Sequence, residues 1–241
     1  MNLLLTSCLL ILSLCQVDTT YAPQRVRLDY PSNGRPDSPY RTTLPCYNKN
    51  LTQMTPCGGN DYINTARHHV DPWSTIRTFW NSVIMNSNHT SNGMSTVWTQ
   101  YIKLYPQADV DTDPNVIPLV KGIQAGTIVH DATAQYPEGY EDFMQFLAWL
   151  PGNLFIGPQD RSDDPGDGFE TTAYVVIGRI RWGYLQKTYD YMKIYRNTDS
   201  VSTVKKNMLQ LASAINGIIA PYPLKGQNWE RNSNGTYRLK T

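Results

Sequence analysis

The segment 138–150 restricts the folds open to this chain more than any other segment. Coiled as a helix, it carries large apolar side chains on nearly every side: Tyr140, Phe143, Met144, Phe146, Leu147, Trp149 and Leu150. A helix that is apolar all round is stable only when other elements cover it. We therefore expect it at the centre of a hydrophobic core, and Pro151 and Gly152 should end it.

Three more helices are predicted from start signals and apolar spacing. Asp71 as N-cap and Pro72 at the first helical position precede a helix with apolar residues up to position 84. Apolar residues at helical spacing predict another helix at 97–105 and a last one at 200–219. The acidic, proline-containing stretch 108–118 is predicted to be a loop.

Strands are predicted in three places. Segment 126–130 is a short candidate, and 173–177 is rich in β-branched residues, which is typical of a buried strand. Within 180–195, apolar and aromatic residues alternate with a period of two, which predicts antiparallel strands. The predicted fold class is α+β, a single mixed domain with about three to four helices and a small, mainly antiparallel sheet.

Composition excludes two classes of protein. The chain has 241 residues, which suits one large domain, and its sixteen Tyr, six Trp and five Phe argue against disorder. A net charge of +1 argues against nucleic-acid binding by phosphate neutralisation. The glycine pairs match neither a dinucleotide loop nor a P-loop, and we predict no cofactor.

Residues 1–22 have the pattern of a secretory signal peptide. An apolar run from Met1 to about Leu14 precedes a polar stretch, and Ala22 suits the position before cleavage. The run is shorter than the roughly 20 apolar residues of a membrane-spanning helix. No Lys or Arg precedes the run, so a buried N-terminal helix is the alternative. We expect a secreted protein without a membrane span, with an extended arm at 23–60 and the main α+β domain at 61–241.

Cysteines and sequons agree with a secretory route. Cys46 and Cys57 are the two cysteines that follow the signal segment, and in an oxidising compartment they should form a disulfide. Sequons for N-glycosylation occur at Asn50, Asn88 and Asn234, each in a polar stretch typical of a surface loop. Without further Cys, a cysteine metal cluster is not predicted.

His130 and Asp131, at the end of the strand predicted at 126–130, are the first candidate catalytic pair. A carboxylate beside an imidazole can orient or charge it for acid–base catalysis, and Glu138 and Glu141 could join the pair. The alternative is that His130 ends a strand and Asp131 caps a turn. No Gly-x-Ser-x-Gly motif indicates a nucleophilic serine.

An acidic loop at 160–170 is the second candidate site. It carries five carboxylates: Asp160, Asp163, Asp164, Asp167 and Glu170. We predict Asp163 and Asp164 as catalytic carboxylates, since paired acids hydrolyse glycosidic bonds. The alternatives are a Ca²⁺ site without EF-hand spacing, a recognition loop for a partner, and a solvated turn whose Asp side chains cap backbone donors.

A histidine pair and a basic, aromatic segment are two further candidate binding features. His68 and His69 are adjacent, so on a strand they face opposite sides, and a shared metal ion is not predicted. Basic and aromatic residues interleave over 179–196, as in a platform for sugar rings or bases. We favour the simpler interpretation, a half-buried sheet with an aromatic core face.

Two functions follow from these patterns. The favoured one is a secreted, N-glycosylated hydrolase that acts on an extracellular polymer such as a glycan, because His130, Asp131 and the acidic loop both flank the apolar helix. The alternative is a binding or effector glycoprotein that uses the loop 160–170 for recognition. The expected partners are an extracellular polymer or glycan, or a cell-surface protein, and no nucleic acid.

Overall fold

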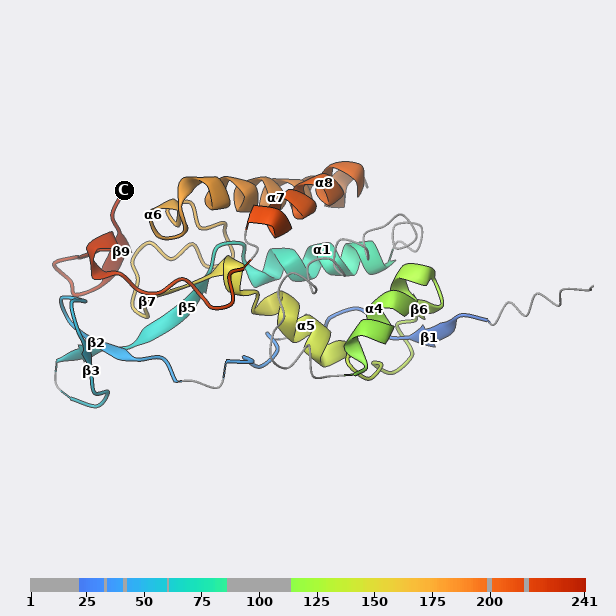
Figure 1. Ribbon diagram of the computed structural model, residues 1–241, viewed down its shortest axis with the longest axis horizontal. Helices are drawn as coiled ribbons and strands as arrows, with labels where there is room; N and C mark the ends of the chain where they lie inside the picture. The colour runs from blue at the N-terminus through green and yellow to red at the C-terminus, as the bar shows by residue number, and fades with distance from the viewer. Residues whose placement is uncertain are drawn as a thin grey trace, which may run out of the picture.

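Helices fill the middle of the molecule, and short strands lie towards both ends of its long axis (Figure 1). The computed structural model describes residues 22–32, 34–40, 43–59, 61–85, 114–198, 201–214 and 217–241. Most of the signal segment, the sequon at Asn88 and the helix predicted at 97–105 lie outside these ranges.

The centre of the core is built from α1 (Trp73–Met85), α5 (Tyr140–Ala148) and α7 (Arg179–Thr198). The prediction of a central helix at 138–150 is confirmed, because Phe143, Met144 and Phe146 of α5 are fully buried. The Trp80 ring of α1 meets Phe143 edge-on at 5.1 Å between ring centroids. On its other side α1 contacts α7, where Phe79 meets Tyr195 at 5.3 Å.

Two predicted strand regions are helices, so those predictions are wrong. Segment 173–177 contains α6 (Tyr174–Ile177), and 180–195 lies inside α7; α8 (Val201–Ala214) confirms the helix predicted at 200–219. Up to residue 195, the fully buried positions of α7 are Leu185, Thr188, Met192 and Tyr195. Their spacing of three or four residues is helical. Half-buried aromatic side chains before and between them, at Trp182, Tyr184, Tyr189 and Tyr191, produced the apparent period of two.

The chain forms helix α4 over Val116–Ala125, although we predicted a loop as far as residue 118. Pro118 lies in the first turn, where a proline costs no intrahelical hydrogen bond. Gly126 ends the helix with a positive φ of 71°. The next strand, β6 (Ile128–His130), confirms the prediction for 126–130 and pairs in parallel with β1 (Gln24–Val26).

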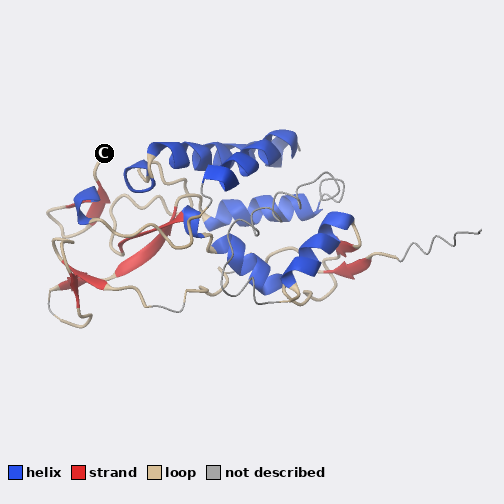
Figure 2. Cartoon of the chain, in the orientation of Figure 1, coloured by secondary structure: helices blue, strands red, loops and turns tan. Residues whose placement is uncertain are grey.

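The remaining strands form three small antiparallel sheets (Figure 2). The first joins β2 (Cys46–Asn48) to β3 (Met54–Thr55) and β4 (Tyr62–Ile63). The second pairs β5 (Thr65–His69) with β7 (Leu154–Pro158), and the third pairs β8 (Trp229–Arg231) with β9 (Tyr237–Leu239). Short 3₁₀ turns, η2 (Pro151–Asn153) and η3 (Gly226–Asn228), precede β7 and β8.

The α+β fold class is therefore confirmed, with more helices than predicted and with the strands divided among several small sheets. The predicted disulfide is also present: Cys46 and Cys57 are bonded, with their Cα atoms 5.4 Å apart. Within the described ranges, no helix combines the length and apolar character that crossing a membrane requires.

Candidate functional site

His130 and Asp131 lie at the end of β6, and both have local structural partners. His130 Nδ1 accepts a hydrogen bond from the Leu28 backbone N–H at 3.1 Å. Asp131 Oδ1 accepts from both the N–H and the hydroxyl of Thr133, and these bonds lower the pKa of Asp131. This arrangement is the alternative that the sequence left open, a strand end followed by a capped turn.

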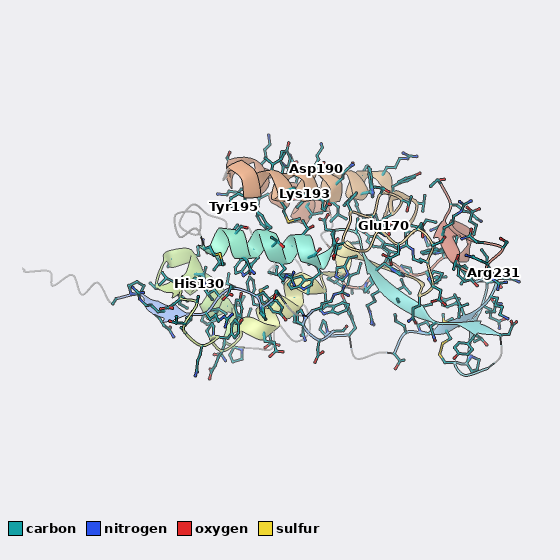
Figure 3. All side chains as sticks on the ribbon, turned by 180° about the vertical axis from the view of Figure 1, so that it is seen from behind. His130, Glu170, Asp190, Lys193, Tyr195 and Arg231 are labelled. Carbon is teal, nitrogen blue, oxygen red and sulfur yellow. A yellow bond between two sulfur atoms is a disulfide. The ribbon has the colours of Figure 1, made fainter. Side chains whose placement is uncertain are left out.

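The acidic loop lies far from this pair. Figure 3 shows Glu170 near the end of α1 that follows β5, whereas His130 lies beyond the other end of that helix. Asp163 and Asp164 belong to the same loop as Glu170, and neither contacts His130 or Asp131. The expectation that the four predicted catalytic residues share one cleft is therefore not met, because His130 and the acidic loop lie at opposite ends of α1.

A buried arginine inside the loop organises its carboxylates. The Arg161 side chain is 0% exposed and donates from Nε to Asp163 at 3.0 Å and from Nη1 to Glu170 at 2.7 Å. Its guanidinium lies over the rings of Phe155 and Trp229 at 5.4 and 5.3 Å. Burial disfavours the charge, but the hydrogen bonds and charges of both acids outweigh it and raise the pKa of Arg161.

This ion-paired unit fixes the loop to the strands beside it. Asp163 Oδ2 accepts the Leu239 backbone N–H of β9 at 2.9 Å, and Glu170 Oε1 accepts the Thr172 hydroxyl at 2.8 Å. Two of the five carboxylates are thus structural, including the predicted catalytic Asp163. The sequence offered one signal for this structural role, a single arginine within the acidic loop, because a buried cation needs carboxylates beside it.

The other side of the loop borders a cleft of about 520 Å³. Four segments line it: Ser32, Gly34 and Arg35 of the N-terminal arm, residues 67–69 at the end of β5, residues between 72 and 77 at the start of α1, and residues between 161 and 170. The arm is held in place by side-chain hydrogen bonds from Trp73 to Gly34 O and from Trp149 to Pro36 O, at 3.3 and 2.8 Å. The cleft is therefore largely preformed, as ligand sites usually are.

Arginines form one wall of the cleft. The Arg35 guanidinium lies 5.1 Å over the Trp149 ring, and that of Arg67 lies 4.6 Å over Tyr40. Burial lowers the pKa of both arginines, so each guanidinium has lost part of its hydration. Arg77, on α1, donates to the Ser32 carbonyl.

Asp164 and Asp167 face the cleft from the loop. The Asp164 side chain is 46% exposed; its Oδ1 accepts the Gly166 N–H at 2.8 Å, and its Oδ2 lies 3.5 Å from His68 Nδ1. This contact between a histidine and an aspartate joins residues far apart in sequence. It is reached because β5 and β7 pair antiparallel, with His68 opposite Phe155 and the loop following β7.

Both imidazoles beside the cleft are neutral at pH 7. Burial, together with the charge of Arg161, lowers the pKa of His68 to about 4, and burial with the charge of Arg35 lowers the pKa of His69 to about 4. His68 Nε2 donates to Pro158 O at 3.0 Å, and His69 Nε2 donates to Ala148 O at 2.6 Å. His68 Nδ1 is therefore an acceptor that faces another acceptor, Asp164 Oδ2.

Neither the loop nor the histidine pair forms a metal centre. Among the described residues, no group of three or more His, Cys, Asp or Glu side chains is arranged to hold a metal ion. The predicted glycosylation residues that the structure describes lie in exposed turns: Asn50 follows β2, and Asn234 lies between β8 and β9.

Comparison with known proteins gives one distant relative and no family. The chain matches no protein-family model and no solved structure. It is 28% identical over 151 residues to protein p9 of Acyrthosiphon pisum secondary endosymbiont phage 1. The match covers 56% of this chain and 40% of p9, so the chain spans less than half the length of that relative, and the name p9 states no activity.

Proposed function

We propose that this protein is a secreted, N-glycosylated binding protein whose cleft beside the loop 160–170 recognises an extracellular ligand. One observation carries the proposal: a preformed cleft of about 520 Å³ lies between an arginine wall and two exposed carboxylates. Small-ligand sites typically have volumes of roughly 300–1,000 Å³ and a few convergent polar groups. The disulfide and the exposed sequon residues are compatible with secretion.

Binding fits this cleft better than hydrolysis does. An acid–base catalyst needs a group whose pKa lies near the working pH and whose proton can reach the substrate. His68 and His69 each have a pKa of about 4 and donate Nε2–H to a backbone carbonyl. Asp163 and Glu170 are occupied by Arg161, and His130 and Asp131 lie elsewhere.

A hydrolase remains the second candidate, and the observation that favours it is the pair of carboxylates, Asp164 and Asp167, in the same cleft. Such a pair can supply an acid and a base or nucleophile for glycoside cleavage. The substrate would be an extracellular glycan. Formation of cleavage products, lost in Asp164→Asn, would favour the hydrolase over the binding protein.

The test is binding of the secreted protein to an array of extracellular glycans at micromolar concentration, with the double variant Asp164→Asn/Asp167→Asn beside the wild type. We expect the double variant to lose on the order of tenfold in affinity, because charge-assisted hydrogen bonds to the ligand disappear. Asp61→Asn, an exposed acid outside the cleft, is the matched control and should bind as the wild type does. Equal binding by the double variant, or a blank array, would contradict the proposal.

A further inference from the structure

A buried guanidinium places positive charge beside the cleft. Arg161 has a fully buried side chain, and its Nη2 has no hydrogen-bond partner among the described residues, although Nε and Nη1 are both paired. Buried polar groups in folded proteins are almost always hydrogen-bonded. Arg161 also lines the cleft. Because Nη2 is closed to solvent, the Arg161 guanidinium adds positive charge beside the cleft without itself contacting a ligand.

Two arginines outside the loop add cationic donors to the cleft. Arg35 and Arg77 line the cleft, and neither forms an ion pair with any carboxylate in the described part of the chain. The start of α1, at Pro72 to Ser74, faces the same space, and the N-terminus of a thirteen-residue helix attracts negative charge. Partly dehydrated arginines bind planar or tetrahedral oxyanions through paired N–H groups. This end of the cleft therefore suits a carboxylate or sulfate.

The loop side has the opposite chemistry. Asp164 and Asp167 are acceptors, and His68 Nδ1 is a third acceptor that faces Asp164 Oδ2 at 3.5 Å. These atoms accept hydrogen bonds and therefore need donors from a ligand. Hydroxyl groups of a ligand are such donors. A simple inorganic oxyanion could use the arginine side but would be repelled by this side.

We propose that the cleft binds an acidic sugar, a pyranose that carries a carboxylate or sulfate, with the oxyanion on Arg35 and Arg77 and the hydroxyls on Asp164 and Asp167. This inference rests on the proposed binding function and names its ligand class. It accounts for a cleft lined by both arginines and carboxylates, since a uronic acid or sulfated sugar has both an anion and several hydroxyl donors.

The experiment is saturation-transfer NMR and titration of the secreted protein with glucuronate, galactose 6-sulfate, galactose and inorganic sulfate. We expect both acidic sugars to bind at least about tenfold more tightly than galactose or sulfate, and the affinity to fall with added salt. Arg35→Gln and Arg77→Gln should each weaken acidic-sugar binding by on the order of tenfold. Arg238→Gln, in an exposed ion pair on β9, is the matched control and should bind normally.

Other outcomes separate this inference from the proposed function. Equal affinity for galactose and the acidic sugars, or sulfate binding as tight as theirs, would overturn the acidic-sugar proposal while the cleft remains a binding site. So would tight binding of a cationic or zwitterionic ligand in place of acidic sugars. If no probe binds, but Asp164→Asn/Asp167→Asn still abolishes binding to glycan arrays, only the ligand class is wrong. If array binding ignores every cleft variant, the proposed function itself fails.

Discussion

The ion pair of Arg161 makes the sharpest prediction about stability. In the wild type, Glu170 is 2% exposed and its Oε2 accepts from Arg161 Nη1 at 2.7 Å. Arg161→Met keeps most of the apolar contact with Phe155 and Trp229 but leaves Glu170 buried without its cation. Removing one partner of a buried pair costs about 3–5 kcal/mol, because the remaining charge has lost both water and partner.

The reverse variant, Glu170→Met, should cost less, since Asp163 still accepts from Arg161 Nε at 3.0 Å. In the double variant, Arg161→Met/Glu170→Met, no uncompensated charge remains at position 170. We therefore expect the double variant to be no less stable than Arg161→Met alone, with a coupling energy of at least about 2 kcal/mol. In a domain of this size, Arg161→Met should lower Tm by on the order of 10 °C.

The assay is equilibrium urea unfolding followed by tryptophan fluorescence, because Trp229 lies directly under the Arg161 guanidinium. Arg238→Met serves as the matched control: its pair with Glu230 is exposed and should contribute less than about 1 kcal/mol. The reasoning is refuted if Arg161→Met costs no more than Arg238→Met. It is also refuted if the losses of the two single variants simply add in the double variant.

Four further predictions follow from buried or exposed single groups. Burial, with the charge of Asp190, raises the pKa of Asp71, so the folded protein keeps a proton there that the unfolded chain releases. The stability of the protein therefore falls as the pH rises above about 4. In urea, Asp71→Asn should be more stable than the wild type at pH 8 but equal to it at pH 4. His69 makes stability depend on pH in the opposite direction, because its pKa is about 4 in the folded protein and 6.5 in the unfolded chain. Lowering the pH from 6.5 to 4 should therefore reduce the free energy of unfolding by up to about 3 kcal/mol. In His69→Gln, the urea midpoint should depend less on pH over this range. Reduction of Cys46–Cys57, which closes a short loop, should cost at most about 3 kcal/mol and loosen the arm, seen by amide exchange, while the core still melts cooperatively; loss of that transition would contradict this. Asn50→Gln and Asn234→Gln should each remove one glycan, measured as a mass decrease of the secreted protein, and an unchanged mass would show that the sequon is unused.

The parts of the fold that sequence could predict are those with a local signal. Helix α5 follows from its all-round apolar pattern, and α1 follows from Pro72 at its start. Strand β6 and the disulfide follow from short local patterns too. Helix α7 does not, since its buried stripe through Leu185, Met192 and Tyr195 is hidden among other aromatic residues that are only half-buried. In such a sequence periods of 2 and 3.6 match equally well.

The candidate site could be predicted only in part. Sequence located the acidic loop, but it paired the loop with His130, whereas the histidine that contacts it is His68. That contact depends on the register of β5 against β7, and strand register between distant segments has no signal in a single sequence. The arginine wall depends likewise on the arm folding over the start of α1.

The concentration of acids in one loop therefore has two separate physical causes. Asp163 and Glu170 compensate the buried charge of Arg161, and without them that guanidinium could not be buried against Phe155 and Trp229. The ion pairs of Arg161 in turn fix the loop, so that its remaining acids, Asp164 and Asp167, lie at the edge of the cleft. A loop held by its own ion pairs loses little conformational entropy when a ligand binds, which favours affinity. A recognition site of this kind needs its structural acids before its ligand-facing acids can act, so Glu170 should matter for binding even though it need not touch the ligand.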